Sequence, residues 1–198
     1  YDHVAAARQE GPSIVQAFHE SMSVRGGRLY AIIADVCAFA NTNGGTLYVG
    51  VSANPKVKPI GLPEDINQSV EQLREEIHRR ITPPVDASIS VAKTEGVPVI
   101  RVQIPRGDDP PYAIDDNKIY LRDETDTNLA VRDEIVQLVL RGAGEQQQIA
   151  PPANTPPAPV EERTAPAPLE TPADDDEIGE GGTEPPRTGV EIVATEKR

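Results

Sequence analysis

Residues 37–51 read CAFANTNGGTLYVGV, in which two apolar segments flank Asn-Thr-Asn-Gly-Gly at 41–45. Asn and Gly tolerate the left-handed conformation in which many helices end. The apolar residues upstream recur at the spacing of one helix face: Leu29, Ile32, Ile33, Val36 and Phe39. The pattern predicts a helix over 28–40, a cap at 41–45 and a strand over 46–51.

The predicted cap has two interpretations. Ending a helix and turning the chain require Asn and Gly residues of this kind, which gives Asn41, Asn43, Gly44 and Gly45 a structural role. Backbone amides in such loops also bind phosphate groups. A second hypothesis is therefore that the same four residues contact a phosphate or a partner chain.

A second helix and a hairpin follow the first strand. Apolar residues at helical spacing predict a helix over 66–81, which the prolines from Pro83 onward stop. Alternating apolar residues at 85–91 and 100–104 predict two antiparallel strands that turn near Gly96.

The remaining pattern predicts another hairpin and a third helix. Residues 112–114 and 119–121 are predicted to pair with each other, and residues 131–139 to be helical, with Thr127 or Asn128 as the N-cap. The fold class is α+β: a mixed or antiparallel sheet built from hairpins, with about three packed helices.

Composition divides the chain into two parts. Residues 1–143 carry 15 Lys and Arg against 20 Asp and Glu, whereas residues 144–198 carry 4 against 12. Ten of the 20 prolines and none of the aromatic residues lie in the second part. Such a segment buries too little apolar surface to offset the entropy of ordering it. We expect a folded domain over 1–143, a disordered acidic Pro/Ala-rich linker over 144–187, and at 188–198 a tail or the start of a further domain.

The chain lacks the signatures of several functions. Its single cysteine, Cys37, lies in an apolar run, which predicts a core thiol without a disulfide or structural zinc site. No Gly-x-x-x-x-Gly-Lys-Ser/Thr segment is present to cradle a nucleoside triphosphate, and no apolar run is long enough to span a membrane. We expect a cytoplasmic protein that needs no cofactor and no metal, and we assign no catalytic residue.

Five segments in register resemble the Schlafen-type, Alba-like domain. They are AFANTNGGTLYVGV at 38–51, IGL at 60–62, RITPP at 80–84, VIRVQIPRGDDPPY at 99–112 and IYLRDETDTNLAVRDEI at 119–135. That family is also described as a divergent AAA domain or a DNA-binding domain. The resemblance covers about residues 5–141 and implies a nucleic-acid-related module, of the kind found at the front of transcriptional regulators in bacteria and archaea.

The resemblance also implies where catalytic acids would lie. Some Schlafen proteins cut RNA with three acidic residues, two of them in a Glu-x-x-x-x-Glu-Phe-Lys motif, and metal-assisted cleavage needs such carboxylates. Here Pro12 and Ala17 stand at the two Glu positions, Phe18 is kept, and His19 replaces the Lys. The segment after the first strand also lacks the third acid.

The first hypothesis is a non-catalytic module that binds nucleic acid. Phosphate contacts need Lys and Arg gathered on one surface. The candidates are Arg25, Arg28, Lys56, Lys58, Arg79 and Arg80. Because the folded part is net negative, we expect weak, salt-dependent binding of DNA or RNA. Arg122 is expected to form an internal ion pair with an acidic residue.

Two alternatives remain open. The net acidity and the missing motif acids also fit a protein–protein interaction or assembly module, which binds a partner protein or a second copy of the chain. A metal-dependent RNA endonuclease requires Glu10 and Glu20 to replace the missing acids, although neither is in register with the motif.

Overall fold

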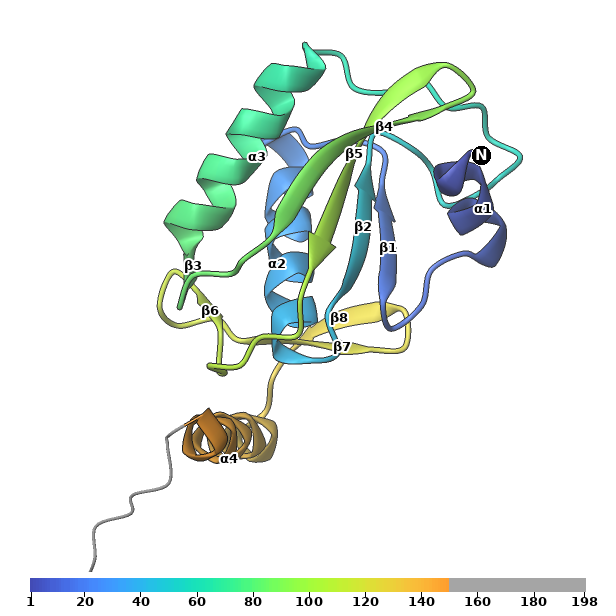
Figure 1. Ribbon diagram of the computed structural model, residues 1–198. Helices are drawn as coiled ribbons and strands as arrows, with labels where there is room; N and C mark the ends of the chain where they lie inside the picture. Colours follow the sequence, from blue (N-terminus) through green and yellow to red (C-terminus); the bar gives the residue numbers. More distant parts are fainter. Residues whose placement is uncertain (150–198) are drawn as a thin grey trace, which may run out of the picture. The chain divides into compact units, whose positions relative to one another are not determined.

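The computed structural model describes residues 1–149, and a four-stranded sheet lies at its centre (Figure 1). The strand order is β1–β2–β5–β4, and the sheet is mixed because β1 pairs with β2 in parallel while the other pairs are antiparallel. The bounds are β1 Gln16–His19, β2 Gly45–Val49, β4 Ser88–Thr94 and β5 Val97–Ile104. The α+β class is confirmed, and so is the hairpin of β4 and β5.

Helices cover both faces of this sheet (Figure 1). On one face lie α2 (Arg28–Asn41), which connects β1 to β2 after a short 3-10 turn η1 (Arg25–Gly27), and α3 (Ile66–Arg80). On the other face lies α1 (His3–Glu10), which the sequence analysis did not predict. The predicted helices at 28–40 and 66–81 are confirmed to within a residue at each end.

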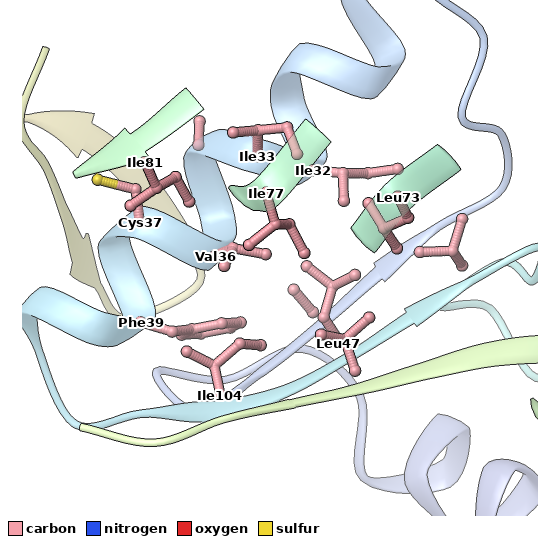
Figure 2. Packing of buried hydrophobic residues seen from close by; sticks show 14 of the residues in the cluster. Ile32, Ile33, Val36, Cys37, Phe39, Leu47, Leu73, Ile77, Ile81 and Ile104 are labelled. Carbon is pink, nitrogen blue, oxygen red and sulfur yellow. The ribbon is translucent and has the colours of Figure 1, made fainter. Parts of the chain in front are cut away.

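The main core fills the space between the sheet, α2 and α3. Figure 2 shows Val36 and Phe39 of α2 beside Leu47 of β2, with Leu73 of α3 approaching from the side; all four side chains are 0% exposed. Cys37 is buried in the same cluster, as predicted, and its Sγ lies 3.2 Å from the carbonyl oxygen of Tyr112. Burial raises the pKa of this thiol to about 11.

A second, smaller core lies beneath α1. Val4 and Ala7 of this helix pack on Tyr48, Val51 and Val99 of the sheet. The helix has few large apolar residues, so its sequence gives a weak helical signal.

The joint between α2 and β2 depends on two glycines. Gly44 has a φ of +69°, and a Cβ there would lie 2.7 Å from the backbone nitrogen of Arg106 and from the carbonyl oxygen of Ile104. A Cβ on Gly45 would lie 2.6 Å from the carbonyl oxygen of Val15. Both positions therefore require glycine, because the backbone next to β1 and β5 approaches too closely for a Cβ.

Asn41, predicted to belong to the cap, is instead the last residue of α2 and is buried. Its side-chain amide donates to the carbonyl oxygens of Tyr112 and Tyr120, each at 2.9 Å, and its Oδ1 accepts from the backbone N–H of Tyr112 at 2.7 Å. Of the four residues of the predicted cap loop, Asn43 alone is exposed.

The predicted pairing of 112–114 with 119–121 is wrong. β6 (Ala113–Ile114) pairs with β3 (Ile81–Thr82), and β7 (Tyr120–Asp123) pairs with β8 (Asp126–Leu129). The turn after β6 is closed by a single bridge between Ile114 and Lys118. β6 therefore pairs with β3, the strand that follows α3, and β7 pairs with β8, the strand that begins after residue 124.

The predicted N-cap of the last helix is also wrong, because Thr127 and Asn128 lie in β8. The helix α4 (Arg132–Ile149) begins later, where Glu134 accepts a hydrogen bond from the backbone N–H of Val131 at 3.0 Å. It runs past residue 143, the expected domain end. The rest of the expected linker at 144–187 and the element at 188–198 lie, from residue 150 on, outside the described residues.

The close approach at Gly45 gives a direct prediction. Gly45→Ala should lower the free energy of unfolding by about 2 kcal/mol, because the new methyl group meets backbone that cannot move aside. Urea denaturation measures this. Gly144→Ala is the matched control: nothing lies within 4 Å of a Cβ at Gly144, so this change should be neutral or stabilise the helix by up to about 1 kcal/mol. Equal effects of the two substitutions would contradict the packing argument.

Candidate functional site

An open pocket of about 440 Å³ lies between β1, α2 and the β7–β8 hairpin. β1 and α2 follow each other along the chain, whereas the hairpin comes from a distant part of the sequence. Apolar and polar side chains both line the pocket. The lining residues are Pro12, Ala17, Phe18, His19, Tyr30, Ala31, Ala34, Asp35, Tyr120, Arg122, Thr125, Asp126 and Thr127. Its volume is in the range of small-molecule and cofactor sites.

A histidine and a carboxylate meet in this pocket. His19, at the end of β1, places its Nε2 2.5 Å from Oδ2 of Asp35 on α2. Both side chains are mostly buried, with 19% and 10% of their surface exposed. The other carboxylate oxygen of Asp35 accepts a hydrogen bond from Oγ1 of Thr127 at 2.7 Å. The Thr127 hydroxyl thus orients the Asp35 carboxylate, and the carboxylate in turn orients the His19 ring.

Arg122 joins this cluster to the start of β1. Its guanidinium lies 3.8 Å from Oδ1 of Asp35 and donates to the carbonyl oxygens of Ser13 and Gln16 at 2.9 and 3.2 Å. It also lies over the ring of Phe39, 5.1 Å from the centroid. Burial lowers the pKa of Arg122. The predicted internal ion pair is confirmed, and it holds the β7–β8 hairpin against α2.

Two tyrosines form another wall. The hydroxyl groups of Tyr30 and Tyr120 are 2.7 Å apart, and burial raises the pKa of Tyr30 above its usual value. Arg80 lies over the Tyr30 ring at 5.2 Å and donates to Oδ2 of Asp115 at 2.7 Å. The hydrogen bond to Arg80 lowers the pKa of the Asp115 carboxyl. The ion pair of Arg80 and Asp115, outside the pocket, therefore holds Arg80 against the Tyr30 ring.

The six predicted phosphate-binding residues lie on three segments. Arg25 and Arg28 are exposed at the start of α2, and Arg28 lies one helical turn before Ala31 of the pocket wall. Lys56 and Lys58 are exposed on the loop after β2. The other two, at the end of α3, are already paired.

Arg79 and Arg80 each have an acidic partner. Arg79 donates to Glu76 at 2.7 Å, and Arg80 is held by Asp115. Arg80 also contacts a pocket residue, because its guanidinium lies over the ring of Tyr30. The structure thus brings Arg80 to the pocket wall and leaves the two lysines on a separate loop.

The positions that the family resemblance assigns to catalytic acids also lie here. Pro12 and Ala17 line the pocket, and neither side chain can bind a metal ion. Glu10 and Glu20 are exposed. Within residues 1–149, no three His, Cys, Asp or Glu side chains come together in a way that could hold a metal ion. Among the same residues, no helix is both long enough and apolar enough to cross a membrane.

The sequence analysis did not identify the pair of His19 and Asp35. A signal was present, because Asp35 is the single charged residue in the apolar stretch from 29 to 41. A carboxylate on a buried helix face needs a partner. What the sequence does not show is the partner, since His19 comes from the preceding strand and Thr127 from a distant hairpin.

Comparison with protein families gives a match to the family described as "Schlafen, AlbA_2" over residues 15–131. Comparison with curated proteins gives no match.

Two solved structures are similar at low identity. The DIP2311 protein from Corynebacterium diphtheriae is 20% identical with a TM-score of 0.46, and the match covers 61% of this chain and 26% of that one. The N-terminal domain of a protein from Nitrosomonas europaea, described as related to the ATP-dependent DNA helicase RecG, is 18% identical with a TM-score of 0.43. That match covers 54% of this chain and 74% of the other. The chain therefore spans about a quarter of the length of the first structure.

The central carboxylate gives a prediction about stability. Asp35→Ala should lower the free energy of unfolding by about 3 kcal/mol, because it leaves the Arg122 guanidinium buried without its carboxylate. Asp133→Ala is the matched control, since Asp133 pairs with Arg132 at the surface, where both side chains are more than four-fifths exposed; it should cost about 0.5 kcal/mol. Urea denaturation of both variants measures the difference, and similar costs would show that Asp35 does not hold the hairpin.

Proposed function

Because the chain belongs to the Schlafen AlbA_2 family, we propose that it binds single-stranded nucleic acid without cutting it. The observation that supports this most is the pocket with an aromatic wall and the exposed Arg28 one helical turn from it. Unstacked bases pack on aromatic side chains while Lys and Arg contact the phosphates. Duplexes hide the faces of their bases, so the pocket favours a single strand.

The charges suited to phosphate contacts are Arg25, Arg28, Lys56 and Lys58. All four are exposed, and none of them forms an ion pair within the described residues. Arg28 is the best placed, because Tyr30 and Ala31 of the pocket follow it on the same helix. Lys56 and Lys58 would contact phosphates further along the nucleic acid. With few free cations on a net acidic protein, the affinity is modest and falls as salt is raised.

The residues at the motif positions support the proposed absence of cleavage. Pro12 and Ala17 occupy the positions where the resemblance places two metal-binding carboxylates. A regulatory role in a longer protein, as in the transcriptional regulators that the resemblance implies, is consistent with a module that binds without reacting.

The position of Arg28 gives the test. Arg28→Glu should weaken binding of a labelled single-stranded RNA roughly tenfold at about 50 mM salt, because a phosphate contact is replaced by repulsion. Fluorescence anisotropy of the 198-residue chain measures it. Arg132→Glu is the charge-matched control, since Arg132 is exposed on α4 and should change affinity less than twofold. If the unmodified chain does not bind at low salt, the proposed function is wrong.

A second candidate function is protein–protein interaction or assembly, and one observation favours it. Large apolar side chains are exposed on the end of β8 and along α4, among them Leu129 at 59%, Val139 at 50% and Leu140 at 60%. Exposed apolar patches of this kind often mark interfaces. A second copy of the chain is the simplest partner to examine.

Assembly through α4 predicts a concentration-dependent mass. Sedimentation at about 100 μM, well above a micromolar Kd, should show a dimer that Leu140→Glu converts to monomer. Gln72→Glu, at an exposed position of α3, adds the same charge away from α4 and should leave the dimer intact. A monomer at every concentration would exclude self-assembly and leave a partner protein as the remaining form of this candidate.

A further inference from the structure

β1 is an edge strand, because no strand within residues 1–149 pairs with it on the side away from β2. Its residues Ala17, Phe18 and His19 line the pocket. The carbonyl oxygens of Val15 and His19 accept hydrogen bonds from β2, from the N–H groups of Thr46 and Gly50 at 2.8 and 2.7 Å. In a strand, alternate residues direct their backbone groups to opposite edges. Gln16 and Phe18 therefore direct theirs outward.

These two outward residues differ in their partners. The backbone groups of Gln16 are used: its N–H bonds to Ser13, and its carbonyl oxygen accepts from Ser13 and from Arg122. The N–H and C=O of Phe18 bond to no turn, loop or side chain within residues 1–149, and they point away from β2, the strand that pairs with β1. The Phe18 side chain packs on the opposite face of the sheet, stacked on Tyr48 at 5.3 Å. Its contribution to the pocket is therefore the backbone.

A free N–H next to a free C=O is complementary to a nucleobase edge. The Watson–Crick edge of each base carries a hydrogen-bond donor beside an acceptor, so one residue of an extended strand can satisfy both. Around this edge the pocket has an apolar floor of Ala17, Ala31 and Ala34 and the aromatic wall of Tyr30 and Tyr120. A flat ring with a polar edge fits both surfaces.

We propose that this pocket binds one unstacked base of a single-stranded nucleic acid, with its ring against Tyr30 and Tyr120 and its Watson–Crick edge on the N–H and C=O of Phe18. The inference rests on the proposed function and names the part of the ligand that the pocket recognises. Because a lone donor–acceptor pair fits every base, binding requires a base but discriminates little among the four.

Filling the pocket tests this inference. Ala31 is exposed on α2 and lines the pocket, so Ala31→Leu should fill the pocket without disturbing the core. The variant should bind a single-stranded RNA roughly tenfold more weakly than the unmodified chain, which is the loss expected for one stacked base. Thr125→Leu fills the pocket from the hairpin side and should act in the same way. Ala143→Leu, at an exposed position of α4, is the matched control and should have no effect.

An abasic oligomer separates the base pocket from phosphate binding. It should bind the unmodified chain as weakly as intact RNA binds the Ala31→Leu variant, and the substitution should cause no further loss. A 2-aminopurine placed in the RNA should be quenched by the unmodified chain and not by the filled variants.

Each remaining outcome is decisive. If Ala31→Leu and Thr125→Leu lower the affinity for intact and abasic oligomers equally, or lower neither, the pocket does not bind a base. Salt-dependent binding of the unmodified chain would still support the proposed function. If the unmodified chain binds neither oligomer at low salt, the proposed function and this inference both fail.

Discussion

The passage from α2 to β2 through Gly44 and Gly45 is the constraint on which the rest of the structure depends. Because neither residue has a Cβ, the backbone of β1 approaches on one side and that of β5 on the other. This places β2 in the interior of the sheet and directly beneath α2. It also leaves β1 as an edge strand beside α2, which is where the pocket forms. The loop that resembles a phosphate-binding turn thus has a structural role: its two glycines let neighbouring backbone pack closely.

A few polar contacts then set the shape of the pocket. Asn41 binds the backbone on both sides of the turn after β6, and Arg122 binds β1 and Asp35. Both side chains are buried, so their donors must be satisfied within the protein. As a result, the β7–β8 hairpin is held opposite the edge of β1. The open pocket lies between the hairpin, β1 and α2.

The sequence predicted the parts that depend on local pattern. The periodicity of α2, α3 and the β4–β5 hairpin was enough, as was the isolation of Cys37 in an apolar run. It failed where pairing is non-local: the strand at 112–114 has partners in β3 rather than in the next segment, and α1 is too poor in large apolar residues to stand out. For the site, local clusters of basic residues suggested candidate arginines, which remain predictions. His19, Asp35 and Thr127 meet only after folding, and the free backbone of Phe18 has no sequence signal.

The central claim is that ligand binding occurs at the edge of β1 and not on the basic loop alone. The most direct measurement is an amide chemical-shift titration of the ¹⁵N-labelled 198-residue chain with a short single-stranded RNA. The account predicts that the amide of Phe18 moves most, together with those of His19 and of residues 125–127, because the bound base accepts from the Phe18 N–H. Shifts confined to residues 52–58, with an unchanged Phe18 amide, would contradict it.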